Sequence, residues 1–258
     1  MLNHSDAKEE IIKVGKLLHE KGFISAGDGN ISIRLDEDRI LTTPTGLSKG
    51  FLKKEDLVVI DMKGKKVSGS RNPSSEILMH LCVYEEREDV KAVVHAHPPV
   101  STAFSIAGVS LAKCILPEVV CTLGAIQTAD YATPGTQEVP EAIRELIKDH
   151  DALILDRHGT LTVGKELFEA YMKVEKVEHT ALVTLNARQL GDVRLLSEEE
   201  VGKLEELHGA KMSKSESHKC VNCNGCGLSE PEPEPEEKDE DELVKKIYDE
   251  VKREMTKV

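Results

Sequence analysis

Three histidines are the residues of this sequence with the clearest capacity for chemistry. His95 and His97 lie two positions apart in an apolar stretch that Pro98 ends. Side chains two apart on a β-strand project from the same face, so both imidazoles can reach one metal ion. Taken alone, such a pair is more often two core or surface histidines that bind no metal. His158 follows another apolar stretch and precedes a glycine, which permits close approach of the backbone to a ligand. Three histidines that leave one position open are typical of catalytic zinc.

A glutamate, Glu76, stands at the start of a predicted helix, in the sequence NPSSE at residues 72–76. The pattern predicts a helix over residues 75–86 with Ser74 as its N-cap, which places Glu76 in the first turn. Glu76 is then either a carboxylate that only stabilises the helix start or a catalytic acid/base. The same helix start offers free backbone N–H groups and two hydroxyls, which suit a phosphate. Two turns, GDGN at 27–30 and TPTG at 43–46, are either further walls of that site or ordinary turns.

Alternating helical and strand-like stretches are predicted to position these groups. Apolar residues recur at helical spacing in some stretches and at every second position in others. Predicted helices cover residues 6–20, 75–86, 139–148 and 165–190, and predicted strands cover residues 31–35, 39–42, 57–62, 92–95 and 152–155. The first two strands are expected to form a hairpin. This interleaving indicates an α/β fold, a three-layer α/β/α sandwich.

Composition and charge exclude several classes of function. The 258 residues carry a formal net charge of -13, and aromatic residues make up 3% with no Trp. A phosphate-backbone binder and a base-stacking surface are both unexpected, so nucleic acid is not a predicted partner. No apolar run is long enough to span a bilayer, and the first residues are polar from position 3 onward. We therefore expect a cytoplasmic protein without a membrane partner.

Composition changes near residue 209, which suggests three parts. Residues 1–208 form the predicted domain, residues 209–241 a Cys-containing and acidic Glu/Pro linker, and residues 242–258 an amphipathic helix. The linker holds Cys220, Cys223 and Cys226, which could ligate a metal or cluster or stay as reduced, redox-sensitive thiols. The sequence assigns them no metal.

The order of the motifs is more specific than any one of them. GDGNIS, TPTG, PSSE, VVHAHP, YATPGT and RHG follow one another between residues 27 and 159. In this order the chain resembles the class II aldolase/adducin family, and within it the L-fuculose-1-phosphate aldolase branch, over roughly residues 5–208. The resemblance implies a mixed, mostly antiparallel sheet between helical layers. It also implies a homotetramer with active sites at subunit contacts.

The resemblance gives each candidate residue a role. It makes His95, His97 and His158 the ligands of one Zn²⁺ per subunit, a site that other divalent metals could also occupy. Glu76 becomes the catalytic acid/base, and a further ligand of the metal before substrate binds. The phosphate of a sugar-phosphate substrate would be bound by Gly29, Asn30, Thr45, Gly46, Ser74 and Ser75.

The implied reaction is metal-dependent cleavage of a ketose 1-phosphate, with L-fuculose 1-phosphate as first candidate, to dihydroxyacetone phosphate and L-lactaldehyde. Alternatives on the same scaffold are a sugar-phosphate dehydratase and a pentulose-phosphate 4-epimerase, although such epimerases typically carry aspartate in place of Glu76. An adducin-like scaffold protein is the non-enzymatic alternative. Such catalytically inactive domains lack metal ligands that this chain retains.

The chain departs from the family in two aromatic positions. The family's tyrosine is absent from residues 114–116, and Pro134 stands where an aromatic follows YAT. Proton delivery to the aldehyde oxygen is thus left open between Tyr131, a group of a neighbouring subunit and water. Beyond the family domain, the acidic linker and terminal helix resemble the encapsulation peptides of bacterial microcompartment cargo enzymes. The helix would then dock on shell or cargo proteins.

Overall fold

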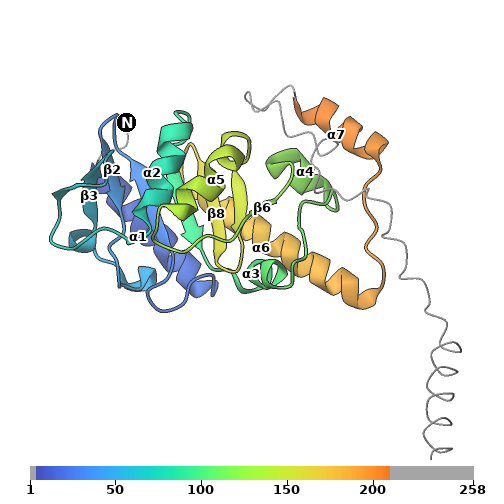
Figure 1. The fold of residues 1–258 in the computed structure, drawn as a ribbon, viewed down its shortest axis with the longest axis horizontal. Helices are drawn as coiled ribbons and strands as arrows, with labels where there is room; N and C mark the ends of the chain where they lie inside the picture. Colours follow the sequence, from blue (N-terminus) through green and yellow to red (C-terminus); the bar gives the residue numbers. More distant parts are fainter. Residues whose placement is uncertain (1–3, 210–258) are drawn as a thin grey trace, which may run out of the picture. The chain divides into compact units, whose positions relative to one another are not determined.

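Eight strands form one sheet in the computed structural model, which describes residues 4–209 (Figure 1). The strands are β1 Asn30–Arg34, β2 Arg39–Thr42, β3 Val58–Asp61, β4 Lys66–Ser68, β5 Ala92–Ala96, β6 Gln127–Ala129, β7 Ala152–Leu155 and β8 Gly159–Gly164. Their order across the sheet is β4-β3-β2-β1-β5-β8-β7-β6. Neighbouring strands are antiparallel except for the parallel pair β6 and β7. The sheet is therefore mixed and mostly antiparallel, as the resemblance implied.

Helices cover both faces of this sheet (Figure 1). The α-helices are α1 His4–Glu20, α2 Ile77–Glu86, α3 Pro99–Ile106, α4 Pro117–Leu123, α5 Glu138–Asp149, α6 Leu167–Leu190 and α7 Glu198–Gly209. Two 3₁₀ turns, η1 Lys49–Phe51 and η2 Lys54–Asp56, lie between β2 and β3. Helices α2 and α5 pack together on one face, while α1 and α6 pack on the other. The three-layer α/β/α sandwich is confirmed.

The two-residue period of the strands divides the core between these faces. In β5, Val93 belongs to the cluster under α2 and α5, whereas Val94 belongs to the cluster under α1 and α6. In β2, Ile40 and Leu41 divide in the same way. Helix α1 contributes its apolar stripe, with Ile11 fully buried, to the second cluster. Both faces of the central strands are thus covered, which holds their ends in fixed positions.

The predicted helices and strands are all present, with ends within a few residues of those expected. The prediction missed α3, α4 and α7 as well as β4, β6 and β8. Helices α3 and α4 are short and start at a proline in the first turn, so their apolar period is hard to detect. None of the helices within residues 4–209 has the length and apolarity needed to cross a bilayer. From residue 210 on, the predicted linker with its three cysteines and the C-terminal helix at 242–258 lie outside the described residues.

Candidate metal centre

The three histidines lie where the central strands of the sheet end. His95 is the penultimate residue of β5, and His97 follows the strand directly. Strand β8 begins immediately after His158 and runs antiparallel to β5. Ala96 pairs with Thr160, so His158 lies beside the end of β5 that carries His95 and His97. Gly159 is required at this crossing, since a Cβ there would lie 2.3 Å from the carbonyl oxygen of Ala96. Two stretches more than sixty residues apart therefore bring their imidazoles to one point.

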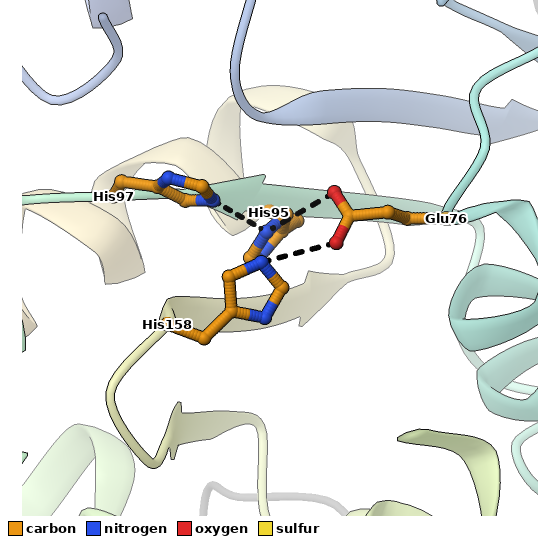
Figure 2. Close-up of side chains that lie close together, drawn as sticks. All are labelled: Glu76, His95, His97 and His158. Carbon is orange, nitrogen blue, oxygen red and sulfur yellow. Dashed lines mark hydrogen bonds and ion pairs between the residues drawn. The ribbon is translucent and has the colours of Figure 1, made fainter. Parts of the chain in front are cut away.

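The side chains of Glu76, His95, His97 and His158 point toward one another (Figure 2). One ligand atom of each lies within 4.8 Å of the others. The Nε2 atoms of His95 and His97 are 2.9 Å apart. Nε2 of His158 lies 3.0 Å from Oε1 of Glu76, and Nε2 of His95 lies 3.5 Å from Oε2. The structure thus brings together all four predicted metal-site residues.

Two of the imidazoles, those of His95 and His97, are prepared to act as ligands in their neutral form. His95 is fully buried, and its Nδ1–H donates to the carbonyl oxygen of Thr160 at 2.8 Å, which leaves the lone pair on Nε2. Burial lowers the pKa of His95 well below its ordinary value. Burial also lowers the pKa of His97, and the nearby His158 adds to that effect. Fewer protons then compete with a metal ion at neutral pH.

This donor set fits a zinc ion. Ligands at about 2.1 Å in tetrahedral geometry are roughly 3.4 Å apart, close to the separations observed between these nitrogen and oxygen atoms. Ring nitrogens and a carboxylate converge on one point, where a cation would neutralise their combined negative potential. Three histidines with one carboxylate match the donor set of a catalytic rather than a structural site. The Nδ1 of His97 lies 3.9 Å from the carboxylate of Asp28, which is beyond hydrogen-bond distance.

Glu76 occupies a different position in its helix from the one predicted. Helix α2 starts at Ile77, so Glu76 is the N-cap residue rather than a first-turn residue, and Ser74 is not the N-cap. The Ser74 hydroxyl instead accepts a hydrogen bond from the N–H of Glu76 at 3.2 Å in the turn before the helix. Burial alone would raise the pKa of Glu76, but hydrogen bonds from His158 and Asn30 and the charges of His158 and His95 outweigh it and lower the pKa.

The turns of the expected phosphate site lie beside this centre. The chain at Pro44 pairs with the chain at Pro73, and the N–H of Ser74 donates to the carbonyl of Thr43 at 3.1 Å. A Cβ on Gly27 would contact Gly46 at 3.4 Å, so the GDGN turn packs against the TPTG turn. Thr45, Gly46 and Ser75 are exposed, whereas Gly29, Asn30 and Ser74 are buried. The Asn30 side chain is already hydrogen bonded to Glu76 and His80.

The YATPGT segment also adjoins the site. A Cβ on Gly135 would lie 3.4 Å from the carbonyl of Ser75, which places this segment against the PSSE turn. Tyr131 is 55% exposed, and the guanidinium of Arg157 lies 4.6 Å from its ring centroid. Tyr131 is therefore an accessible residue in contact with the RHG turn that carries His158. All six motifs noted in the sequence therefore meet at one place.

Two buried residues of this region escaped the sequence prediction. Lys49 is 2% exposed, and its Nζ donates to the carbonyl of Gly27. Burial lowers the pKa of Lys49, while the charges of Asp28 and Glu76 act in the opposite sense. His80 is fully buried one helical turn after Glu76. The four-residue spacing from Glu76 to His80 was the available signal for the histidine, but no local pattern marks the lysine.

Comparisons with known proteins agree with this geometry. Residues 9–185 match the family described as Class II Aldolase and Adducin N-terminal domain. The chain is similar to an L-fuculose phosphate aldolase of Methanococcus maripaludis, 41% identical over 172 residues, 67% of this chain and 92% of that protein. It is also similar to a 3-oxo-tetronate 4-phosphate decarboxylase of Haemophilus influenzae, 34% identical over 77% of this chain and 95% of that protein. A solved structure of an L-fuculose 1-phosphate aldolase superposes with a TM-score of 0.74 at 32% identity, over 80% of this chain and 97% of that one.

Proposed function

Because the chain belongs to the class II aldolase and adducin family, we propose that it is a zinc-dependent lyase that cleaves a ketose 1-phosphate. L-fuculose 1-phosphate is the first candidate substrate, and the products would be dihydroxyacetone phosphate and L-lactaldehyde. The observation that carries the proposal is the convergence of three imidazoles and the Glu76 carboxylate within 4.8 Å. A scaffold protein would have no use for this arrangement.

The surrounding turns support a phosphorylated substrate. Thr45, Gly46 and Ser75 present exposed backbone and hydroxyl groups next to the metal ligands. Ser74 accepts from the N–H of Glu76, so its own hydroxyl hydrogen remains available to a phosphate oxygen. Gly29 and the backbone of Asn30 complete the proposed phosphate site. Phosphate binding here would position the reacting carbons of the sugar at the metal centre.

The chain's own residues divide the chemistry between them. His95, His97 and His158 would hold the cation, which when bound polarises the ketone and offsets negative charge on the substrate oxygens. Cleavage needs a base that takes the proton from the hydroxyl of the carbon that leaves as the aldehyde, and the candidates are Tyr131, a group of a neighbouring subunit and water. As the carbon–carbon bond breaks, the aldehyde leaves and the electron pair stays on the carbon next to the ketone. The carboxyl group of Glu76 would donate a proton to that carbon, and in the synthetic direction its carboxylate would remove the proton.

Decarboxylation is the second candidate, and the similarity to 3-oxo-tetronate 4-phosphate decarboxylase favours it over other reactions. Loss of CO₂ from a 3-oxo-tetronate 4-phosphate also leaves an electron pair on the carbon next to a ketone. Protonation of that carbon also yields dihydroxyacetone phosphate. The metal site and Glu76 could therefore serve either reaction, and the group that leaves distinguishes them.

The 4-epimerase alternative has less support, whereas a sugar-phosphate dehydratase would also keep the three histidines and a glutamate. Glu76 stands at the position where such epimerases typically carry aspartate, and its carboxylate lies within 3.5 Å of two imidazoles. An adducin-like scaffold would have lost ligands that this chain keeps. Carbon–carbon bond cleavage therefore remains the reaction class that we propose.

The assembly that we propose is a homotetramer. Helix α6 carries five exposed large apolar side chains, whose relative exposures range from 37% to 91%: Phe168, Met172, Leu182, Leu185 and Leu190. Such a row on one helix supports an interface between copies of the chain. Sedimentation equilibrium of the purified protein measures this directly, and a monomer at micromolar concentration would contradict it.

The test is a product assay that separates the two leaving groups. We expect dihydroxyacetone phosphate together with an aldehyde from L-fuculose 1-phosphate or another ketose 1-phosphate. Release of CO₂ from 3-oxo-tetronate 4-phosphate, without aldehyde formation from any ketose, would identify the decarboxylase instead. A chelator should abolish activity, and zinc should restore it.

The matched variant for this assay is Glu76→Gln, which keeps the size of the side chain. We expect its rate to fall by about 10²- to 10⁴-fold, the usual contribution of a general acid or base. Cleavage at the wild-type rate by this variant, or by chelator-treated protein, would overturn the proposal.

A further inference from the structure

The polar side chains of β1 lie buried beneath the metal centre. Ile31 and Ile33 face the core under α1 and α6. Because side chains alternate along a strand, Asn30, Ser32 and Arg34 face the other side, where α2 lies. Asn30 is 2% exposed and Ser32 is fully buried. Asn30 and Ser32 thus belong to the contact between β1 and α2 rather than to a solvated surface, while Arg34 at the end of the strand is partly exposed.

Helix α2 presents a matching series to β1. Glu76, His80 and Tyr84 recur at four-residue intervals, so they line one face of the helix. Tyr84 is 2% exposed and His80 is fully buried. Every second residue of β1 and every fourth residue of α2 is polar in this contact. The polar side chains of the strand therefore lie opposite those of the helix.

Consecutive hydrogen bonds join these residues into one chain. Asn30 Nδ2 donates to Oε2 of Glu76 at 2.8 Å, and Asn30 Oδ1 lies 2.5 Å from Nε2 of His80. On the other side of the ring, His80 Nδ1 lies 2.6 Å from the hydroxyl of Ser32. The Ser32 hydroxyl lies 2.9 Å from the hydroxyl of Tyr84.

Only one direction of donation fits these contacts. A carboxylate accepts hydrogen bonds, so the amide nitrogen of Asn30 faces Glu76 and the amide oxygen faces His80. Nε2 of His80 must then carry the hydrogen, and Nδ1 accepts from Ser32. The Ser32 hydroxyl, having donated, accepts from Tyr84. Every hydrogen in the chain points toward the Glu76 carboxylate.

The protonation state of the ring is consistent with this direction. Burial lowers the pKa of His80 to about 4, so the imidazole is neutral at neutral pH. A neutral imidazole donates at one nitrogen and accepts at the other, as the chain requires. Buried polar groups without partners cost free energy, so each member of the chain depends on its neighbours.

We propose that His80 is a positioning residue for Glu76, acting through the Asn30 amide. Its Nε2–H fixes the amide so that Nδ2–H holds Oε2 of Glu76, while Oε1 stays directed at His158. The carboxylate is thereby aimed at the substrate carbon as well as at the metal site. This inference rests on the proposed function, because it assigns Glu76 a proton transfer that must be aimed.

The experiment compares His80→Leu with His80→Gln. Leucine fills the space without a donor, whereas glutamine retains an amide N–H that can reach Asn30. The reaction to follow is exchange of the carbon-bound hydrogen of dihydroxyacetone phosphate with D₂O, since it needs only proton transfer at that carbon. We expect His80→Leu to lower the exchange kcat by about 10- to 100-fold with KM within about twofold. His80→Gln should restore most of the loss, and Tyr84→Phe, at the far end, should lower kcat by less than about threefold.

A second measurement uses the unaltered protein without added metal. With ¹⁵N-labelled histidine, the resonances that disappear in His80→Gln belong to His80. We expect a protonated Nε2 and an unprotonated Nδ1. The opposite tautomer would overturn the proposed direction even if the leucine variant fails to fold.

The possible outcomes separate this inference from the proposed function. Unchanged exchange in His80→Leu, or equal losses with a raised KM in both His80 variants, would mean that His80 serves only packing. No exchange by the wild-type enzyme would instead reject the proposed function, and the positioning role with it.

Discussion

Helix α2 connects two polar clusters that differ in how their groups are paired. At its first end, Glu76 meets His95, His97 and His158, and ring nitrogens approach one another to 2.9 Å. Ring nitrogens and carboxylate oxygens converge there on a shared point. At its other end, Arg87 follows the helix as its C-cap and lies in an ion-pair cluster. Strands β5, β7 and β8 also run between these two ends of the sheet.

The cluster at Arg87 is fully paired within the chain. Its guanidinium donates to both carboxylate oxygens of Asp89 at 2.8 Å and to Asp151 at 2.9 Å. The ammonium of Lys173 donates to Asp151, to Glu169 and to the carbonyl of Val163, all at 2.8–2.9 Å. Opposite charges meet here, whereas potential metal ligands meet at the candidate metal centre. The first arrangement stabilises the fold, and the second is a donor set that a cation would complete.

Loss of a proposed metal ligand should give the largest fall in activity, and it tests the metal-centre end of α2. In His158→Ala we expect lyase activity to fall by at least about 10³-fold, because the cation contributes several kcal/mol of charge stabilisation. Zinc should raise the Tm of the wild-type protein but not that of the variant. The unfolding free energy of the metal-free protein should fall, because Glu76 loses the hydrogen bond from His158.

The matched control is His4→Ala, an exposed histidine at the start of α1. It should keep both the activity and the zinc-dependent rise in Tm. A zinc-stabilised, active His158→Ala variant would mean that the cluster is a paired structural network like the one at Arg87.

Loss of the Asp151 carboxylate, at the other end of α2, should lower stability and leave activity nearly unchanged. Asp151→Asn leaves Arg87 and Lys173, with side chains 13% and 11% exposed, without their shared partner. We expect the unfolding free energy to fall by about 2 kcal/mol at pH 7, a value reduced for the partial exposure of Asp151. Activity at a temperature where the variant is folded should change by less than about twofold.

The pH dependence of this loss follows from the pKa of Asp151. Burial alone would raise that pKa, but the charges and hydrogen bonds of Lys173 and Arg87 lower it below the ordinary value of 3.8. The stabilisation is therefore complete above the unfolded-state pKa and disappears as the pH falls through the lower folded-state pKa. Urea unfolding of wild type and variant should differ fully at pH 7 and progressively less below about pH 4. Asp149→Asn, an exposed neighbour, should show neither effect, and a constant difference at all pH values would contradict the assignment.

The sequence predicted which side chains converge at the candidate metal centre, because the parts of this cluster are local and carry distinct chemistry. The spacing of His95 and His97 on an apolar strand and the RHG turn both place imidazoles at strand ends. The resemblance through the ordered motifs then related these separate stretches. The fold class followed from the alternation of helical and strand-like patterns, which tertiary packing did not overturn.

The supporting residues could not be found in this way. Ser32 and Arg34 alternate with Ile31 and Ile33, a pattern that fits equally a strand with one solvated face. That Ser32 is buried depends on the position of α2, a long-range contact absent from the local pattern. The N-cap prediction for Ser74 was wrong for a related reason: pairing of the chain at Pro44 and Pro73 holds Ser74 before the helix, which delays the helix start to Ile77.

Lys49 gives the smallest expected effect and sharpens the comparison, because it is a full positive charge buried at the metal-centre end. Its Nζ donates to the carbonyl of Gly27, and the Gly27 turn packs against Gly46 of the proposed phosphate site. A buried cation beside that site can bind an incoming phosphate, whereas the cations at Arg87 already have carboxylate partners. In Lys49→Met, which keeps the apolar stem, we expect the KM for the sugar phosphate to rise about tenfold, or roughly 1.4 kcal/mol of binding.

The stability of Lys49→Met decides between binding and packing roles. Burial lowers the pKa of Lys49, so the folded protein holds its charged form at a cost that methionine removes. The variant should therefore unfold at the same urea concentration as wild type or a higher one. Its inhibition by inorganic phosphate should weaken in parallel with the rise in KM. A destabilised variant with unchanged KM and unchanged phosphate inhibition would show that Lys49, like Arg87, serves the fold.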